Sequence, residues 1–188
     1  AVICNAVDEA IATHAAILTE LGDPKAALLF HARFAMVDRM RIEQHVLHIF
    51  GKNADSSLRA GKIVVATQVI EQSLDLDFDV MITDLAPFDL VVQRAGRLWR
   101  HMQQRPAMAR PVPAPCLAVI SPDPASVQSP RWLEPALGAG AFVYRHPGYM
   151  WRTAKLLFER GALPQPDEPA FRSMLDDTYA AGTDDLPE

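Results

Sequence analysis

The chain has no apolar run close to the roughly 20 residues that a membrane-spanning helix requires, which argues against a membrane partner. Its first residues have neither the basic lead nor the long apolar core of a secretory signal. Cysteine is also scarce: Cys4 and Cys116 lie in separate apolar runs, without the spacing of metal ligands. We therefore expect two buried thiols in a reducing cytoplasm and no metal site.

Two catalytic motifs are absent as well. A phosphate loop, G-x-x-x-x-G-K-[S/T], would need a glycine at Ser56 and a hydroxyl at Ile63 to include Gly61 and Lys62. No His-Asp dipeptide occurs. His45 and His48 could bind a metal from one helix face, but they have no nearby carboxylate and favour a partly exposed polar face. The start of the chain, without methionine and on a strand-like run, indicates a segment of a longer polypeptide.

The charged residues are unevenly distributed, although the net charge is only −5. Residues 71–89 contain six acidic residues and no basic one, whereas residues 94–110 contain five arginines and no acidic one. Such segregation can create a local charged site that the net charge hides.

Short, continuous apolar runs alternate with amphipathic stretches. Runs of this kind are typical of strands covered on both faces; they are Val2–Cys4, Ala27–Phe30, Ile63–Ala66, Val80–Ile82 and Leu117–Ile120. Between them, residues 6–21 predict a helix with Asn5 as its N-cap, ended by Gly22, and apolar residues from 36 to 50 predict another, ended by Gly51. The pattern predicts an α/β fold with a doubly wound, mostly parallel sheet and helices on both faces.

The composition changes after the last of these strands. Residues 106–135 are rich in proline, and residues 149–160 and 168–180 predict two helices. We therefore expect a core over residues 1–125 and a proline-rich linker with a short helical extension over residues 126–188. Trp132, Trp151 and Tyr179 are expected to anchor the extension to the core.

Polar segments follow two of the predicted strands, where ligands of parallel sheets bind. If the second segment is helical, Gln93, Arg97 and Arg100 share one face. Guanidinium groups on one face favour a polyphosphate partner. The alternative is a solvated basic face paired with Asp75, Asp77 or Asp89, and the charge pattern leaves both open. Trp99 and His101 could stack on bases, although packing is favoured.

The same segments carry a resemblance. Gln93-x-x-Gly96-Arg97-x-x-Arg100 matches motif VI of superfamily 2 helicases, and Thr67-x5-Ser73-Leu74-Asp75 resembles motif V, with Ser73 in place of glycine. Residues 65–79, 84–87 and 93–101, with Phe30-His31-Ala32-Arg33-Phe34 upstream, resemble the CRISPR-associated helicase–nuclease of type I systems. The resemblance covers most of the chain and is strongest from Gly61 to His101.

The resemblance implies the second RecA-like domain of a helicase motor. Arg97 and Arg100 would be arginine fingers, Gln93 and Gly96 would lie against the nucleotide, and Asp75 would contact the ribose or the coupling network. Thr67, and with less support His31 and Arg33, would bind single-stranded DNA. ATP and Mg would be held mainly by the first RecA-like domain of the same polypeptide, so that this chain alone would not hydrolyse ATP.

Further partners implied by the resemblance are single-stranded DNA and the Cascade surveillance complex, in the cytoplasm. A non-catalytic DNA- or Cascade-binding module derived from the same family remains an alternative. An unrelated doubly wound domain for a small molecule would require the match from Gly61 to His101 to be accidental.

Overall fold

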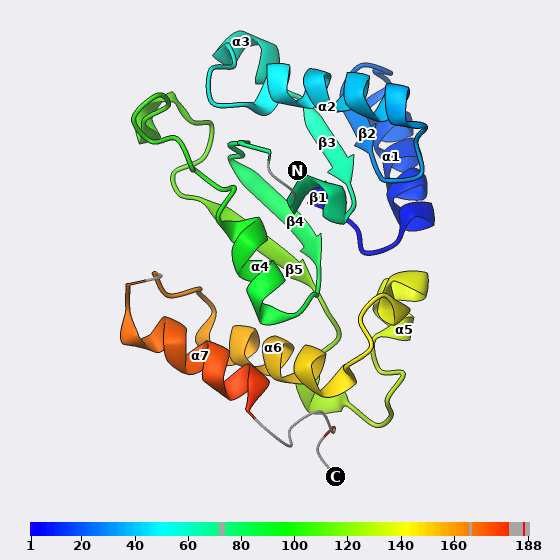
Figure 1. Ribbon diagram of the computed structural model, residues 1–188, viewed down its shortest axis with the longest axis vertical. Helices are drawn as coiled ribbons and strands as arrows, with labels where there is room; N and C mark the ends of the chain where they lie inside the picture. Colours follow the sequence, from blue (N-terminus) through cyan, green and yellow to red (C-terminus); the bar gives the residue numbers. More distant parts are fainter. Residues whose placement is uncertain (72–73, 166, 181–185, 187–188) are drawn as a thin grey trace. The chain divides into compact units, whose positions relative to one another are not determined.

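The computed structural model describes residues 1–71, 74–165, 167–180 and 186 (Figure 1). The strands and α-helices are, in chain order, β1 (Val2–Ile3), α1 (Val7–Leu21), β2 (Ala27–Phe30), α2 (Met36–Phe50), α3 (Ser56–Arg59), β3 (Ile63–Ala66), β4 (Val80–Asp84), α4 (Phe88–Ala95), β5 (Cys116–Ile120), α5 (Glu134–Leu137), α6 (Pro147–Arg160) and α7 (Pro169–Tyr179). A 3₁₀ turn, η1 (Gln68–Glu71), follows β3. No described helix is long and apolar enough to cross a bilayer.

The strands form one sheet in the order β2-β3-β1-β4-β5. Strand β1 pairs in parallel with both β3 and β4, and β2 pairs in parallel with β3. The chain leaves the central strand β1 for the edge strand β2 and then returns inwards to β3. Because right-handed crossovers in opposite directions place their helices on opposite faces, this order gives a doubly wound sheet. The predicted α/β fold is confirmed.

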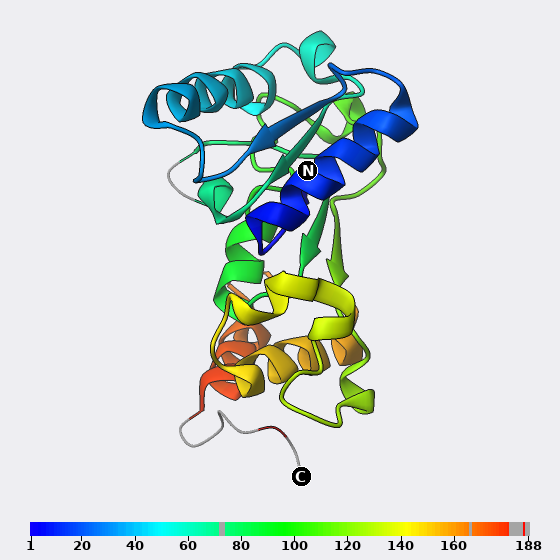
Figure 2. The ribbon, with the colours of Figure 1, turned by 90° about the vertical axis from the view of Figure 1, so that its right-hand side faces the viewer.

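Alternation along β3 separates the two faces of the sheet. Val64 and Ala66 belong to the larger apolar cluster, to which α2 contributes Val46 and Phe50. Val65, between them in sequence, belongs to a smaller cluster to which α1 contributes Ala10. Successive side chains of a strand point to opposite faces, so α1 and α2 cover different faces, as Figures 1 and 2 show.

The chain divides into two compact units. The first comprises residues 1–83 and 94–118, and the second comprises residues 84–93 and 119–188. The division falls at three points, between Thr83 and Asp84 within β4, between Gln93 and Arg94 within α4, and between Ala118 and Val119 within β5. The expected boundary between a core domain over residues 1–125 and an extension over residues 126–188 stays a prediction.

An apolar cluster holds the second unit together. Its buried residues are Leu85, Trp132, Leu133, Leu137, Met150 and Ala154. Trp151 on α6 donates a hydrogen bond from Nε1 to the Pro124 carbonyl oxygen at 2.9 Å, and the Tyr179 hydroxyl at the end of α7 donates to Asp89. The two helices predicted after residue 145 are therefore present, and Trp132, Trp151 and Tyr179 contact other residues of the second unit; their anchoring to the rest of the expected core stays a prediction.

Two local predictions are wrong. The N-cap of α1 is Ala6, without a side-chain cap, because the side-chain oxygen of Asn5 faces the buried guanidinium of Arg94 instead. Cys4 is buried as expected, but Cys116 is exposed, because β5 is an edge strand of the sheet. The Ser73 substitution in the motif V segment lies outside the described residues.

Candidate functional site

The carboxyl ends of neighbouring strands bring His31 and Thr67 together. Phe30 at the end of β2 pairs with Ala66 at the end of β3, and the Thr67 amide donates to the Phe30 carbonyl oxygen at 3.2 Å. Both side chains are buried. The His31 ring stacks on Phe34, with centroids 4.1 Å apart, and burial lowers the pKa of His31, with a smaller contribution from the charge of Arg33.

Arg33 lies near this edge but faces solvent. Its side chain is 61% exposed and forms an ion pair with Asp8, which is 72% exposed, in the first turn of α1. Exposed ion pairs of this kind are worth about 0–1 kcal/mol. A phosphate can therefore replace Asp8 as the partner of Arg33 at little cost.

Arg94 is the largest fully buried side chain among the described residues, and the sequence did not single it out. Its Nε donates to Glu71 Oε1 at 2.7 Å, and its Nη1 donates to the Thr83 hydroxyl at 2.6 Å. Asn5 Oδ1 lies 3.4–3.5 Å from both terminal nitrogens. Within the first unit, Arg94 thus connects the turn after β3 with the ends of β4 and β1.

Arg97 is half-buried and only partly satisfied. Its Nη2 donates to the Glu71 carbonyl oxygen at 3.2 Å, while its Nε is buried and has no hydrogen-bond partner among the described residues. Burial, followed by the neighbouring charge of Arg100, lowers the pKa of the Arg97 guanidinium. A buried N–H without a partner costs free energy that an incoming acceptor would recover.

Asp75 joins the second arginine of the motif to the histidine that follows it. Arg100 Nε donates to Asp75 Oδ1 at 2.8 Å, and His101 Nε2 lies 2.9 Å from the same oxygen. Burial raises the pKa of Asp75, but hydrogen bonds and charge from Arg100 and His101 outweigh it and leave the pKa below its usual value. Arg100 is 41% exposed and its Nη1 also donates to the Gly96 carbonyl oxygen at 3.2 Å.

The expected helical face of Gln93, Arg97 and Arg100 is wrong. Helix α4 ends at Ala95, and the chain then turns so that Leu98 bridges Phe78. The Arg97 carbonyl accepts from the Phe78 amide, and the Trp99 amide donates back to the Phe78 carbonyl. These two backbone bonds replace the helical ones, so the arginines are positioned by a turn. Gln93 is exposed on α4.

The segregated charges largely neutralise each other within the first unit. Asp77 is buried and its carboxylate accepts two bonds of 3.1 Å from Arg110, with Arg59 and Arg105 at 3.6 and 3.8 Å. Asp79 pairs with Arg105 at 2.6 Å and with Arg110 at 3.1 Å. Arg110 also covers the Trp99 ring, which favours packing over base stacking for Trp99. Of the pairings in the alternative for the motif arginines, the one between Arg100 and Asp75 occurs, whereas Asp77 pairs with Arg110, Arg59 and Arg105 and Asp89 accepts from Tyr179.

The structure thus brings two groups of predicted residues together. One is at the strand ends, with His31, Thr67 and the nearby Arg33. The other is Arg97 and Arg100 with Asp75 and Gly96, joined to the sheet through Glu71. His45 and His48 are exposed, and no group of potential metal ligands occurs among the described residues. A doubly wound sheet followed by a turn that presents two arginines defines a helicase-type α/β domain.

The particular family follows from comparison with known proteins. The family model described as CRISPR-associated nuclease/helicase Cas3, C-terminal, matches residues 1–103. The chain therefore belongs to the Cas3 family and contains its C-terminal helicase-region fold.

Among the relatives is the CRISPR-associated endonuclease/helicase Cas3 of Escherichia coli (strain K12), which is 38% identical over 188 residues, 99% of this chain and 19% of the relative. That of Thermus thermophilus is 54% identical over 86 residues, 46% of this chain and 9% of the relative. The chain thus spans about a fifth or less of the length of these relatives.

Solved structures agree with this assignment. T. fusca Cas3-AMPPNP aligns with a TM-score of 0.76 and 32% identity, over 97% of this chain and 20% of that one. A chain of the CRISPR RNA-guided surveillance complex, pre-nicking, aligns with a TM-score of 0.73 and 35% identity, over 94% of this chain and 21% of that one.

Proposed function

We propose that this chain is the second RecA-like half of an ATP-dependent motor that moves along single-stranded DNA, and that it supplies arginine fingers. The observation that carries the proposal is the half-buried Arg97, whose Nε has no partner among the described residues, beside the exposed Arg100. Arg97 offers a donor without a partner, and Arg100 adds a positive charge that its half-exposed pair with Asp75 holds only weakly. Membership of the Cas3 family and the relative with AMPPNP support a nucleotide as that anion.

Arg97 and Arg100 differ in the bonds that each would have to break before it could bind a phosphate. Arg97 is positioned by the Glu71 carbonyl and offers Nε without first breaking a bond. Arg100 has to leave Asp75, but the pair is about half exposed and weak, so a phosphate group can take its place. Bound ATP supplies the phosphoryl group whose transfer drives the motor, and we expect it and Mg to be held mainly by the first RecA-like domain of the same polypeptide.

Asp75, once released from Arg100, is available to a ribose hydroxyl or to the coupling between domains. Gln93 and Gly96 are both exposed, and we propose that they lie against the nucleotide. At the strand ends, Thr67, His31 and Arg33 are proposed to contact the DNA backbone. Arg33 would exchange Asp8 for a phosphate, and such binding weakens steeply with salt.

The test is ATP hydrolysis by the chain alone and by the chain joined to a phosphate-loop domain of the same family. We expect no turnover alone and DNA-stimulated turnover in the joined protein. Arg97→Ala or Arg100→Ala should then lower kcat by about 10³-fold or more, the usual contribution of an arginine finger. Arg160→Ala, which removes an exposed arginine at the end of α6, is the matched control.

Wild-type turnover in Arg97→Ala and Arg100→Ala would refute the arginine-finger assignment. Turnover by the chain alone, lost in Arg97→Ala, would show a complete nucleotide site and refute the division between two domains. A joined protein that binds DNA but does not hydrolyse ATP would favour the alternative, a binding module for DNA or for the Cascade surveillance complex. The similarity to a chain of a surveillance complex is the observation behind that second candidate.

A further inference from the structure

All three tyrosines of the chain line a single pocket in the second unit. The pocket has a volume of about 600 Å³, and its lining comprises Pro87, Asp89, Val143, Tyr144, Arg145, His146, Tyr149 and Tyr179. These side chains come from the turn after β4, the first turn of α4, the segment before α6, and helices α6 and α7. None of them belongs to the arginine motif or to the strand-end group described above.

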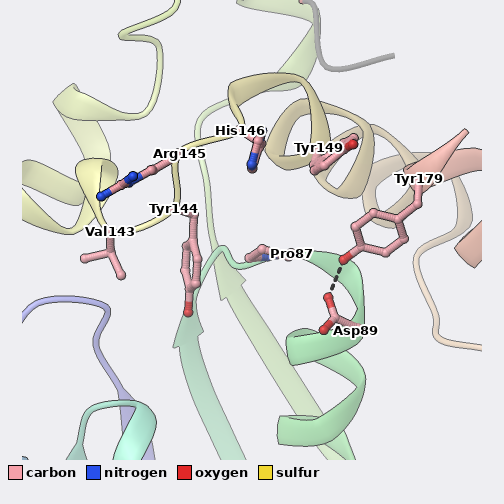
Figure 3. A pocket seen from close by; sticks show the side chains of 8 residues that line it. All are labelled: Pro87, Asp89, Val143, Tyr144, Arg145, His146, Tyr149 and Tyr179. Carbon is pink, nitrogen blue, oxygen red and sulfur yellow. Dashed lines mark hydrogen bonds between the residues drawn. The ribbon is translucent and has the colours of Figure 1, made fainter. Parts of the chain in front are cut away.

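Flat rings form the walls of this tyrosine pocket. In Figure 3 the ring of Tyr144 stands on one side of Pro87, and the pair of Tyr179 and Asp89 stands on the other. Tyr149 and Tyr179 meet edge to face with centroids 5.2 Å apart, and His146 lies 5.1 Å from Tyr149. These contacts between rings fix the positions of Tyr149 and Tyr179 on this side of the pocket.

The tyrosine pocket also has one acceptor and one cation. The Tyr179 hydroxyl donates to Oδ1 of Asp89, and burial, followed by this bond, raises the pKa of Tyr179. Tyr179 thus uses one oxygen of Asp89, and Oδ2 can accept from a ligand. Arg145 is an exposed lining residue whose side chain extends, in Figure 3, on the side of Tyr144 away from Asp89, so that an anionic group of a ligand would meet it beyond the Tyr144 ring.

The charges argue against a cation such as an arginine side chain of a partner. The carboxylate of Asp89 already accepts from the Tyr179 hydroxyl, and the Tyr149 ring already carries the guanidinium of Arg152 at 5.4 Å from its centroid. A nucleotide matches these side chains better. The faces of its base can stack on tyrosine and proline, an amino group of the base can donate to the carboxylate, and the phosphate of the nucleotide can pair with the arginine. The volume is within the range of small-ligand pockets, about 300–1,000 Å³.

We propose that the tyrosine pocket binds a nucleobase with an exocyclic amino group, carried by a phosphate-bearing nucleotide. The base stacks against Tyr144, its amino group donates to Asp89, and Arg145 pairs with the phosphate. The pocket binds without chemical change to the ligand. This proposal goes beyond the motor function and does not depend on it, since the arginine fingers lie in the other unit.

The tyrosine count makes a direct test available. The full chain is produced with 3-fluorotyrosine, so that every fluorine resonance reports on the pocket. We expect dCMP to shift these resonances with saturation and dTMP, which has no amino group, to bind about fivefold or more weakly. A sample with 5-fluorotryptophan is the control, because none of the three tryptophans lines the pocket.

Two variants separate stacking from hydrogen bonding. Tyr144→Leu should weaken dCMP binding about fivefold or more, as expected for the loss of a stacking ring. Asp89→Asn should abolish the preference for dCMP over dTMP while all three fluorotyrosine resonances still respond to the ligands. Phe158→Leu, which changes an exposed aromatic residue of α6 outside the lining, should leave both affinities unchanged.

The source of the base is decided by a second titration with a ten-residue deoxycytidine oligonucleotide. Equal affinity for dCMP and the oligonucleotide identifies a free nucleotide, and much tighter binding of the oligonucleotide identifies a base of a strand. Either result supports the proposal. It is overturned if neither probe shifts the fluorotyrosine resonances, if the tryptophan sample responds equally, or if only N-acetylarginine amide binds. The ATPase assay of the joined protein, read through Arg97 and Arg100, is unaffected by these outcomes.

Discussion

Replacing each of the three arginines of one short segment with methionine should separate one arginine that stabilises the fold from two that we propose to contact a nucleotide. Arg94, Arg97 and Arg100 lie within seven residues, but their side chains are fully buried, half-buried and 41% exposed, respectively. Methionine keeps most of the aliphatic length and removes the charge and the donors. We expect Arg94→Met to destabilise the first unit strongly and the other two changes to leave it nearly unaltered.

The expected loss of folding free energy in each variant depends on which partners the substitution leaves without a hydrogen bond or ion pair. Without Arg94, the Glu71 carboxylate, whose side chain is only 9% exposed, loses its 2.7 Å partner, and the Thr83 hydroxyl loses a 2.6 Å one. Removing one member of a buried ion pair costs about 3–5 kcal/mol. Arg97→Met removes a single bond to a carbonyl, and Arg100→Met removes a half-exposed pair, so each should cost about 1 kcal/mol or less.

Urea unfolding with 5-fluorotryptophan measures this directly, because Trp99 is the tryptophan that belongs to the first unit. The Trp99 resonance should report a much lower unfolding midpoint in Arg94→Met alone. The double variant with Glu71→Gln should recover part of the loss, since the unpaired carboxylate is then absent. Equal midpoints in the three single variants would contradict the buried network around Arg94.

Three further outcomes are expected. Asp77→Asn should lower the free energy of unfolding by about 3–5 kcal/mol because the carboxylate is buried among arginines, whereas Asp8→Asn should change it by less than about 1 kcal/mol; equal urea midpoints would refute this difference. Gly51→Ala should cost about 1–3 kcal/mol in the same assay because a Cβ would lie 2.4 Å from the carbonyl oxygen one turn earlier, and an unchanged midpoint would mean that the helix end shifts freely. Burial lowers the pKa of His31 below 6.5, so its contribution to stability is complete above pH 6.5 and is lost as the pH falls through the folded-state pKa. His31→Gln should flatten the stability–pH curve in that window, and an identical curve in the variant would contradict the assignment.

The fold was predictable because its strands are continuous apolar runs. Ala27–Phe30 and Ile63–Ala66 have the predicted bounds, since strands covered on both faces need apolar residues at every position. The edge strand behaves differently, and the exposed Cys116 shows why: an apolar sequence does not reveal whether a face of the strand is covered. Asn5 was misassigned for a related reason, because its partner Arg94 is 89 residues away.

The candidate site was predictable only as a set of residues. The resemblance identified Asp75, Arg97 and Arg100. The turn that positions the two arginines depends on backbone hydrogen bonds to Phe78, which no local sequence pattern predicts. The role of Arg94 was missed because its charge resembles that of its neighbours in sequence, while its burial is a tertiary property. The tyrosine pocket could not be foreseen either, since Tyr144 and Tyr179 are far apart in the chain and line the same pocket only because of the tertiary fold.

The burial of its carboxylate partner also determines whether an arginine can bind a ligand instead. Arg94 and Arg110 are held by buried carboxylates, and moving either guanidinium would leave Glu71 or Asp77 without its charge partner at a cost of several kcal/mol. Arg100 and Arg33 are held by exposed carboxylates, so that an exchange for phosphate is nearly neutral in free energy. The five arginines between residues 94 and 110 therefore do not form one basic surface. Arg94 and Arg110 are held by buried pairs, and Arg100 is the member of this segment whose carboxylate partner is exposed, so it is the one that we propose exchanges its partner for a polyphosphate.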